Sequence, residues 1–389
     1  MTGKSGLART ARGPVPKRVV ILGSRGLPPS HGGFESLVAR LAPWLLQRGW
    51  SVKVYCQDET PEGGPKEWNG VSLVQVRTRT PGSLGSVEFD LRSTLRALDK
   101  ETVVLTLGYN TAIFGLFYKL YGVTNVVNMD GLEWKRSKWS LPVRWWFWLN
   151  ERAATKLASH MIADHPAIAE RLERISKSAA FTMIPYGAED VRGTDPAPLA
   201  KHGLVSGGYA LVIARVEKEN QILQIVRAFS RRERGIRLVV LGNLYPDVCP
   251  YHAAVRDAAS PEVIFPGAIY DPATVATLRE HAAFYLHGHT VGGTNPSLVE
   301  ALGAGSPVVA HDNPFNRWVA GAEQVYFTDE ADLDARMSEL LAAPERLQAM
   351  SAESRRRHAE NFQWEPVLQA YEQTLLEMAH AAAPAKQEQ

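Results

Sequence analysis

Short runs of apolar residues alternate with longer amphipathic segments through the first half of the chain. The run Arg18–Leu22 (RVVIL) is rich in β-branched residues and is followed by glycine, which is typical of a buried parallel strand that ends in a loop. The segment from Phe34 to Gly49 gathers its apolar residues on one face and stops at a glycine, which predicts a helix. Further strands are predicted to begin at Ser51, Val71, Thr102, Asn125 and His160. Alternating strands and helices predict a doubly wound α/β sheet.

The same alternation restarts after residues 187–208, a stretch rich in Gly, Pro, Asp and Ser that we interpret as a linker. The second set of strands is predicted to begin at Tyr209, Ile236, Val263, Ala283 and Pro307, and the pattern becomes helical after residue 327. We therefore predict two Rossmann-like parallel-sheet domains that face each other across a cleft. The predicted divisions are a disordered tail (1–17), an N-terminal domain (18–190), a C-terminal domain (205–362) and a final helical segment (363–389) that packs back towards the N-terminal domain.

Composition narrows the class of protein further. The chain has 389 residues, of which 45% are hydrophobic and 22% charged, so it is long enough for two globular domains. A net charge of +2 gives no support to a nucleic-acid partner. Two distant cysteines form no metal or disulfide pattern, and no apolar run is long enough to span a membrane. The basic N-terminus has no apolar core and is not a secretory signal, so we expect a cytoplasmic protein.

The stretch His287–Glu300 (HGHTVGGTNPSLVE) carries the strongest chemical signal. Its glycines allow close backbone approach, Asn295 is suited to cap a helix, and the proline after it suits the first helical position. A glycine loop that leads into a helix N-terminus presents unpaired N–H groups and the positive end of the helix dipole. We therefore predict that this loop binds the diphosphate of a nucleotide sugar. Glu300, one turn further, is placed to accept hydrogen bonds from sugar hydroxyls.

Longer motifs resemble a known family. The stretch YLHGHTVGGTNPSLVEALGAGSPVVAHDNPFNR is similar to the donor-binding region of retaining, GT-B-fold glycosyltransferases of family four. The motifs ILGSRGLPPSHGGFESLVARLA and VNMDGLEWKRSKW resemble a bacterial branch that includes rhamnosyltransferases of cell-surface polysaccharide synthesis. The resemblance covers roughly Lys17 to Trp364. It implies a GT-B fold and a metal-independent, cofactor-free transfer of a sugar with retention of configuration.

The resemblance also assigns roles to individual positions. The family has two glutamates separated by seven residues: the second, which holds the ribose, matches Glu300, but the first position is Gly292 here. The family's pyrophosphate-binding arginine matches Arg215, whereas the lysine five residues later is replaced by Asn220. Asp130 stands where many relatives carry a histidine that contacts the sugar 6-hydroxyl. A 6-deoxy sugar has no such hydroxyl, so this difference favours dTDP-L-rhamnose as the donor.

These arguments give a set of candidate site residues. The candidate catalytic residues are Asp130, Arg215 and Glu300. The candidate donor-binding residues are Gly32, Gly33, Arg215, Lys218, Asn220, His289, Gly292, Gly293, Thr294, Asn295 and Glu300. The candidate acceptor-binding residues are Glu35, Glu133, Lys135 and Arg136. Simpler alternatives remain open for several of them: Arg215 can form a surface ion pair, Asp130 can serve only to form a turn, and Glu133, Lys135 and Arg136 can form a surface network. For the His287–His289 pair we expect a phosphate contact or a loop role rather than a metal.

The stretch from Trp134 to Trp148 mixes aromatic and basic residues (WKRSKWSLPVRWWFW). Such a mixture is typical of side chains at a membrane interface, and equally of a buried aromatic helix with solvated ends. The first interpretation predicts peripheral contact with the inner face of the cell membrane and a lipid-linked acceptor.

Several functions compete with rhamnosyl transfer. A hexosyltransferase that uses a UDP- or GDP-sugar and a GT-B epimerase share the same fold. A non-catalytic nucleotide-sugar-binding subunit is suggested by Gly292 and Asn220, which replace two family residues. A nicotinamide-dependent dehydrogenase is a weaker alternative, since residues 23–26 (GSRG) do not form the dinucleotide-binding fingerprint.

Overall fold

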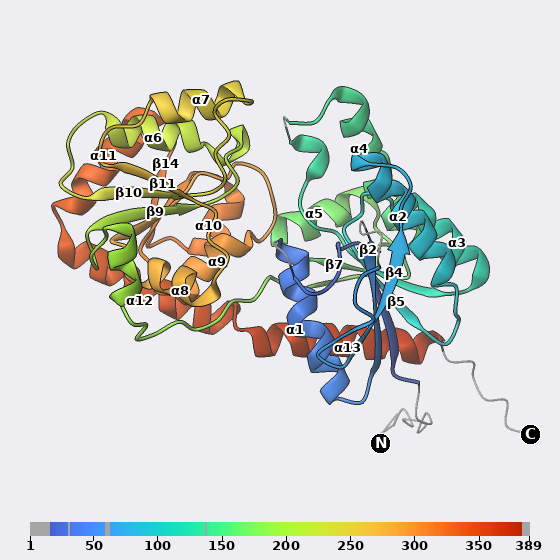
Figure 1. Ribbon diagram of the computed structural model, residues 1–389. Coiled ribbons are helices and arrows are strands. Elements are labelled where there is room, and N and C mark those ends of the chain that lie inside the picture. Colours follow the sequence, from blue (N-terminus) through green and yellow to red (C-terminus); the bar gives the residue numbers. More distant parts are fainter. Residues whose placement is uncertain (1–15, 30–31, 59–62, 137, 383–389) are drawn as a thin grey trace, which may run out of the picture.

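The structure is a computed structural model that describes residues 16–29, 32–58, 63–136 and 138–382. It consists of two α/β domains side by side, with one long helix running beneath the N-terminal domain (Figure 1). The predicted fold class, two parallel sheets of Rossmann type, is confirmed.

The N-terminal sheet has the order β3-β4-β2-β1-β5-β6-β7-β8 and is parallel except for the β3–β4 pair. Its strands are β1 (Arg18–Leu22), β2 (Ser51–Asp58), β3 (Glu67–Trp68), β4 (Val71–Arg77), β5 (Val103–Leu107), β6 (Thr124–Asn128), β7 (His160–Ala163) and β8 (Phe181–Met183). Its helices are α1 (Gly33–Gln47), α2 (Gly82–Arg96), α3 (Gly115–Tyr121), α4 (Leu141–Leu157) and α5 (Pro166–Ile175), with the short helices η1 (Ala112–Phe114) and η2 (Glu133–Lys135). Alternate residues of β1 point to opposite faces: Val19 and Ile21 pack with α1, and Val20 and Leu22 pack towards α2 and α3.

The C-terminal sheet is parallel throughout, with the order β11-β10-β9-β12-β13-β14. Its strands are β9 (Tyr209–Ile213), β10 (Arg237–Leu241), β11 (Val263–Gly267), β12 (Phe284–His287), β13 (Val308–His311) and β14 (Val325–Phe327). Its helices are α6 (Ile222–Ser230), α7 (Pro250–Asp257), α8 (Pro272–Glu280), α9 (Pro296–Gly303), α10 (Pro314–Ala320), α11 (Glu330–Leu341) and α12 (Pro344–Asn361), with the short helices η3 (Ala197–His202) and η4 (Lys218–Asn220). Both faces of this sheet are covered, which explains why its strands read as continuous apolar runs.

Helix α13 (Trp364–Ala382) returns the end of the chain to the N-terminal domain, where it lies against α1 (Figure 1). Its apolar side chains, among them Leu368 and Leu375, belong to the core of that domain. Asn128 donates a hydrogen bond to the hydroxyl of Tyr371 at 2.6 Å, so this helix also contacts the end of β6.

The predicted N-terminal tail falls almost entirely outside the described residues. Lys17, which we assigned to it, donates to the carbonyl of Arg48 at 3.1 Å and lies 3.8 Å from the carboxylate of Glu372. The last residue assigned to the tail therefore has partners in the folded domain.

Candidate active site

A cavity of about 450 Å³ lies between the two domains. Residues that follow β6 and β7 form one wall, and residues that follow β9 and β12 form the opposite wall. In open parallel sheets ligands bind at the carboxyl ends of the strands, so this is the expected place for a substrate. The cavity is lined by these predicted site residues: Gly33, Asp130, Glu133, Arg136, Arg215, Asn220, His289, Thr294 and Asn295.

Helix α9 points its N-terminus at the cavity. As its sequence predicts, Asn295 caps the helix, with its side-chain oxygen accepting the N–H of Ser297 at 3.0 Å. The Ser297 hydroxyl in turn lies 2.7 Å from the hydroxyl of Tyr285 and donates to the carbonyl of Ile213 at 3.1 Å. These bonds fix the helix end to β12 and β9. The positive end of the helix dipole is thus held at the cavity wall, where it favours a negatively charged group.

The glycines before this helix contact the other domain. Gly292 and Gly293 are not among the residues that line the cavity. A Cβ on Gly131, in the N-terminal domain, would lie 3.1 Å from the Cα of Gly292. A Cβ on Gly293 would lie 2.3 Å from both carboxyl oxygens of Asp164. The absence of side chains at these positions therefore allows the two domains to meet, a role that the sequence did not predict.

Asp164, directly after β7, is a site residue that we did not predict. Its Oδ2 accepts the N–H of Thr294 at 2.8 Å, and its main-chain oxygen accepts the hydroxyl of the same threonine. Its Oδ1 is buried and has no hydrogen-bond partner in the described structure. Burial, and secondly the charge of Asp130, raise the pKa of Asp164 to about 8, whereas the Thr294 N–H acts in the opposite direction. Its position at the end of a predicted strand was the available signal.

Asp130 follows β6 and lines the same cavity. Its backbone lies in the left-handed region (φ 51°), which aspartate tolerates better than most residues. The side chain of Asn128 accepts its N–H at 3.0 Å and supports this turn. Both interpretations of Asp130, the turn and the carboxyl group at the site, are therefore compatible with its position.

Arg215 extends from the end of β9 towards the cavity. Its side chain is 66% exposed, and its only ion pair among the described residues is with Glu217, at 3.2 Å. The exposed guanidinium can therefore exchange this half-buried partner, which Lys138 also contacts, for an anionic ligand. Lys218, on η4, is exposed and is not among the residues that line the cavity.

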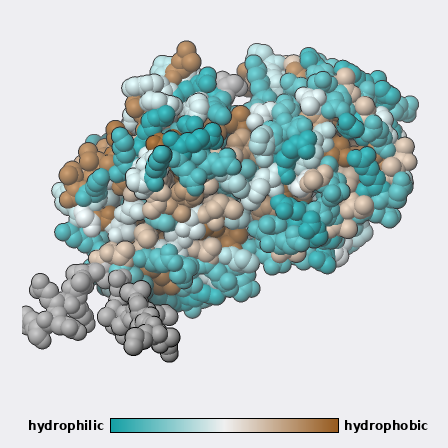
Figure 2. All heavy atoms as spheres, turned by 180° about the vertical axis from the view of Figure 1, so that it is seen from behind, coloured by the Kyte–Doolittle hydropathy of each residue, from teal (hydrophilic) through white to brown (hydrophobic). Residues whose placement is uncertain are grey.

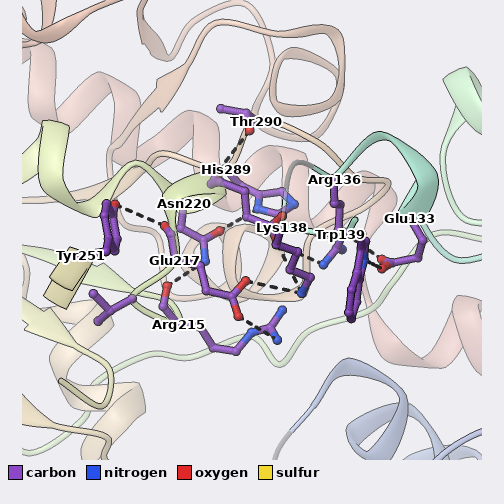
Figure 3. A network of polar contacts seen from close by, with 12 residues as sticks. Glu133, Arg136, Lys138, Trp139, Arg215, Glu217, Asn220, Tyr251, His289 and Thr290 are labelled. Carbon is purple, nitrogen blue, oxygen red and sulfur yellow. Dashed lines mark hydrogen bonds and ion pairs between the residues drawn. The ribbon is translucent and has the colours of Figure 1, made fainter. Parts of the chain in front are cut away.

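A polar network connects the two domains beside this arginine (Figure 3). Arg136 lies 2.8 Å from Glu133 within its own domain and 3.2 Å from Glu219 across the cleft. Lys138 reaches Glu217 at 3.4 Å. Burial is the largest cause that raises the pKa of both Glu133 and Glu219. The predicted acceptor-binding residues Glu133 and Arg136 thus form a bridge between the domains.

The remaining predicted residues lie beside the cavity rather than on its wall. Glu300 forms an ion pair with the largely buried Arg279. Glu35 is buried and accepts the backbone N–H of Arg25 at 2.9 Å, which stabilises the loop after β1. Gly32 precedes α1 as its N-cap, and Lys135 is exposed, 5.6 Å from the centre of the Trp134 ring. The roles that we predicted for these residues stay predictions.

The His287–His289 pair does not belong to a metal site in the described structure, which contains no group of three or more His, Cys, Asp or Glu that could hold a metal ion. Both imidazoles are buried, and burial is the main cause that lowers their pKa, for His287 to about 3. They are therefore neutral at physiological pH and cannot supply a cation to phosphate.

Two family models match separate parts of the chain. Residues 16–189 match a domain of unknown function, and residues 220–373 match a model described as glycosyl transferase-like. A comparison with curated protein sequences found no match.

Solved structures resemble the whole chain. Sucrose-phosphate synthase from Thermosynechococcus elongatus superimposes with a TM-score of 0.77 at 17% identity, covering 94% of this chain and 100% of that one. HepE from Anabaena, in complex with UDP and glucose, gives a TM-score of 0.75 at 13% identity, covering 93% and 100%. The pneumococcal O-GlcNAc transferase GtfA, in complex with UDP and GlcNAc, gives 0.69 at 12% identity, covering 94% and 99%. The chain therefore has the GT-B fold, and its C-terminal half carries a glycosyl transferase-like domain.

Proposed function

We propose that this protein is a glycosyltransferase that moves a sugar from a nucleoside diphosphate to a saccharide or lipid-linked saccharide acceptor, with retention of configuration. The observation that carries the proposal is the cavity between the domains. The N-terminus of α9 and the exposed guanidinium of Arg215 lie on one wall, and the carboxyl groups of Asp130 and Asp164 lie on the other. The complexes of HepE and GtfA with UDP and a sugar support the same class of ligand.

In this proposal the residues on the two sides of the cavity act on different groups of the reaction. During transfer the bond between the anomeric carbon and the diphosphate oxygen breaks, and an acceptor hydroxyl oxygen takes its place. Arg215 and the dipole of α9 stabilise the negative charge left on the diphosphate, because both are positioned before the reaction. Asp130 orients the acceptor hydroxyl and accepts its proton. Helix α13 and the bridge between Arg136 and Glu219 hold the two walls together.

We propose dTDP-L-rhamnose as the donor and cell-surface polysaccharide synthesis as the context. The carboxyl group of Asp130 suits a 6-deoxy sugar, because such a sugar offers no 6-hydroxyl. UDP- and GDP-hexoses are the alternative donors of the same reaction.

The proposal is tested by nucleotide screening followed by a turnover assay. Ligands that bind the native state raise its apparent stability, so thermal shift with dTDP, UDP, GDP and their sugars identifies the donor. We expect the largest shift with dTDP-L-rhamnose, and release of dTDP when an acceptor is added. Stabilisation without release under any acceptor tested would instead indicate a non-catalytic binding subunit, and the absence of stabilisation by every nucleotide would contradict the proposal.

We further propose that the N-terminal domain contacts a membrane, through a surface that shares only Leu141 and Trp145 with the predicted stretch. The rings of Trp134, Trp139 and Trp146 are partly buried in the domain. Apart from Met183 on β8, the exposed large apolar side chains described in this domain lie on α2, η1, α3 and the start of α4. They are Leu84, Leu95, Ile113, Leu116, Leu120, Tyr121, Leu141 and Trp145. No helix in the described part of the chain is long and apolar enough to cross a bilayer.

Figure 2 shows apolar groups gathered along this edge of the N-terminal domain, at the left of that view. Helices α3 and α4 also carry Lys119, Arg144, Arg152 and Lys156, while their one acidic residue, Glu151, is buried and paired with Arg171. Apolar side chains among basic ones match the acyl and headgroup regions of an anionic leaflet.

Replacing both Leu120 and Trp145 with glutamate is expected to reduce co-sedimentation with phosphatidylglycerol vesicles by about tenfold or more, because each change removes apolar contact and adds repulsion. These side chains are 71% and 62% exposed, so the fold should tolerate the changes. Val248→Glu, at an equally exposed apolar position of the C-terminal domain, is the control and should not alter binding. Equal sedimentation of all variants would exclude this surface.

A further inference from the structure

The side chain of Asn220 is held in one orientation. It lies at the end of η4, buried between the loop after β9 and the loop after β12. Its Nδ2 donates to the carbonyl of Arg215 at 2.8 Å, and its Oδ1 lies 2.7 Å from Nδ1 of His289 (Figure 3). A carbonyl can only accept, so the amide nitrogen must face Arg215 and the amide oxygen must face the imidazole.

This orientation decides which nitrogen of His289 carries the proton. The Oδ1 of Asn220 is an acceptor, so Nδ1 must donate to it. The ring is also neutral. Burial, then the neighbouring His287 ring and the charges of Arg136 and Arg215, keep the pKa of His289 well below its usual range, and only the Val291 carbonyl acts in the opposite direction. In the neutral ring with a proton on Nδ1, Nε2 presents a lone pair.

Nε2 is left without a donor. In the described structure no group donates a hydrogen bond to this nitrogen, and His289 lines the cavity. A Cβ on Gly292 would lie only 3.0 Å from Nε2, so glycine at that position keeps the nitrogen uncovered. The cavity therefore contains a neutral hydrogen-bond acceptor beside the loop that leads into α9.

We infer that His289, fixed by Asn220, accepts a hydrogen bond from a hydroxyl of the donor sugar. A lone pair repels phosphate oxygens, so the phosphate contact that we considered for this histidine does not fit its protonation. A sugar hydroxyl is the donor that a nucleotide-sugar ligand can bring to this wall. Asn220 is then a positioning residue. The resembling family has a phosphate-binding lysine at this position, whereas Asn220 determines which nitrogen of His289 carries the proton. The assignment rests on the proposed function.

The test compares the affinity of a sugar nucleotide with that of its parent diphosphate. Isothermal titration with dTDP-L-rhamnose and dTDP, and in parallel with UDP-glucose and UDP, gives this ratio for each variant. His289→Ala is expected to reduce the ratio about tenfold, the loss of one hydrogen bond, while the affinity for the diphosphate alone stays within about twofold. His202→Ala, at a half-buried histidine that does not line the cavity, is the matched control.

A second variant separates positioning from packing. In Asn220→Asp the new carboxylate accepts the Nδ1 proton and stabilises the charged ring, so the pKa of His289 rises despite Arg136, Arg215 and His287 nearby. Below that raised pKa Nε2 carries a proton and can no longer accept. The ratio of the wild type itself changes in this range, because the terminal phosphate of the free diphosphate titrates near pH 6 and that of the sugar nucleotide does not. We therefore expect the ratio of Asn220→Asp, divided by that of the wild type at the same pH, to fall from pH 8 to pH 5.5. A variant that only loosened packing would keep this quotient the same at both pH values.

The outcomes are distinguishable. A wild-type protein that binds neither diphosphate nor sugar nucleotide overturns the proposed function, and this assignment with it. A wild-type protein that binds the sugar nucleotide more tightly than the diphosphate, with the ratio unchanged in His289→Ala, overturns the assignment alone. A ratio in Asn220→Asp that changes with pH no more than that of the wild type overturns the role of Asn220.

Discussion

Replacing Arg215 with alanine is expected to lower kcat for sugar transfer by about 100- to 1,000-fold, the range found when one preorganised group that stabilises a developing anion is removed. The guanidinium lies at the cavity, is 66% exposed and has one ion-pair partner among the described residues, the half-buried Glu217. Its charge is therefore available for a diphosphate. Steady-state kinetics with a saturating donor measures the effect.

The structure also supplies the controls for this experiment. The ion pair of Arg215 is exposed, so its loss should change the free energy of unfolding by less than about 1 kcal/mol, and the thermal midpoint should hardly move. Arg215→Lys keeps the charge but not the forked geometry, and we expect it to recover only part of the rate. Arg231→Ala removes an exposed arginine that pairs with Glu330, away from the cavity, and should leave the rate unchanged. Near-normal turnover of Arg215→Ala would remove this residue from the site.

Gly293→Ala is expected to lower transfer by about 100-fold, because a displacement of about 1 Å at a reacting group has effects of this size. The backbone of Gly293 is not in the left-handed region, so alanine itself is not strained there. The added methyl group would instead lie 2.3 Å from both carboxyl oxygens of Asp164. Either the carboxyl group of Asp164 or the whole cavity wall formed by the N-terminal domain must move. In both cases the hydrogen bond from the Thr294 N–H to Oδ2 of Asp164 is lost.

A double-mutant cycle identifies the cause. Asp164→Ala removes the group that the methyl would strike, so Gly293→Ala should have little further effect in that background, although it is severe alone. Such non-additivity is the signature of two residues in direct contact. Additive losses would mean that Gly293 acts through the loop or the ligand, and not through the contact between the domains.

The pattern of apolar and polar residues was sufficient to predict much of the fold. Apolar runs such as Arg18–Leu22 and the glycine-limited helix after Gly33 follow from local periodicity, and each lies in the corresponding strand or helix. The cap at Asn295 is equally local, since a side chain that accepts a nearby backbone N–H needs no distant partner. The position of the cavity followed from a general property of parallel sheets, whose strands end at the same edge. Arg215, Asp130 and Thr294 were found in this way.

Contacts between residues far apart in the chain could not be found in this way. Asp164 and Thr294 are 130 residues apart, and only the assembled domains show that a carboxyl group from one covers the glycine loop of the other. Likewise the sequence left Arg136 and Glu133 as either acceptor ligands or members of a surface network, because it does not show that Glu219 faces them across the cleft. The aromatic stretch fitted a membrane surface and a buried helix equally, because the side on which each ring packs is decided by β6, β7 and α5, which the pattern of the stretch does not contain.

The sequence by itself thus determined the two sheets, the helix ends and the sheet edge at which the cavity lies, since these depend on neighbours within a few residues. The tertiary structure decided which groups at that edge are free, which are paired and which are protonated. Those properties depend on burial and on charges contributed by both domains. His289 is an example: the carbonyl of Arg215 orients Asn220, and Asn220 then determines which ring nitrogen carries the proton.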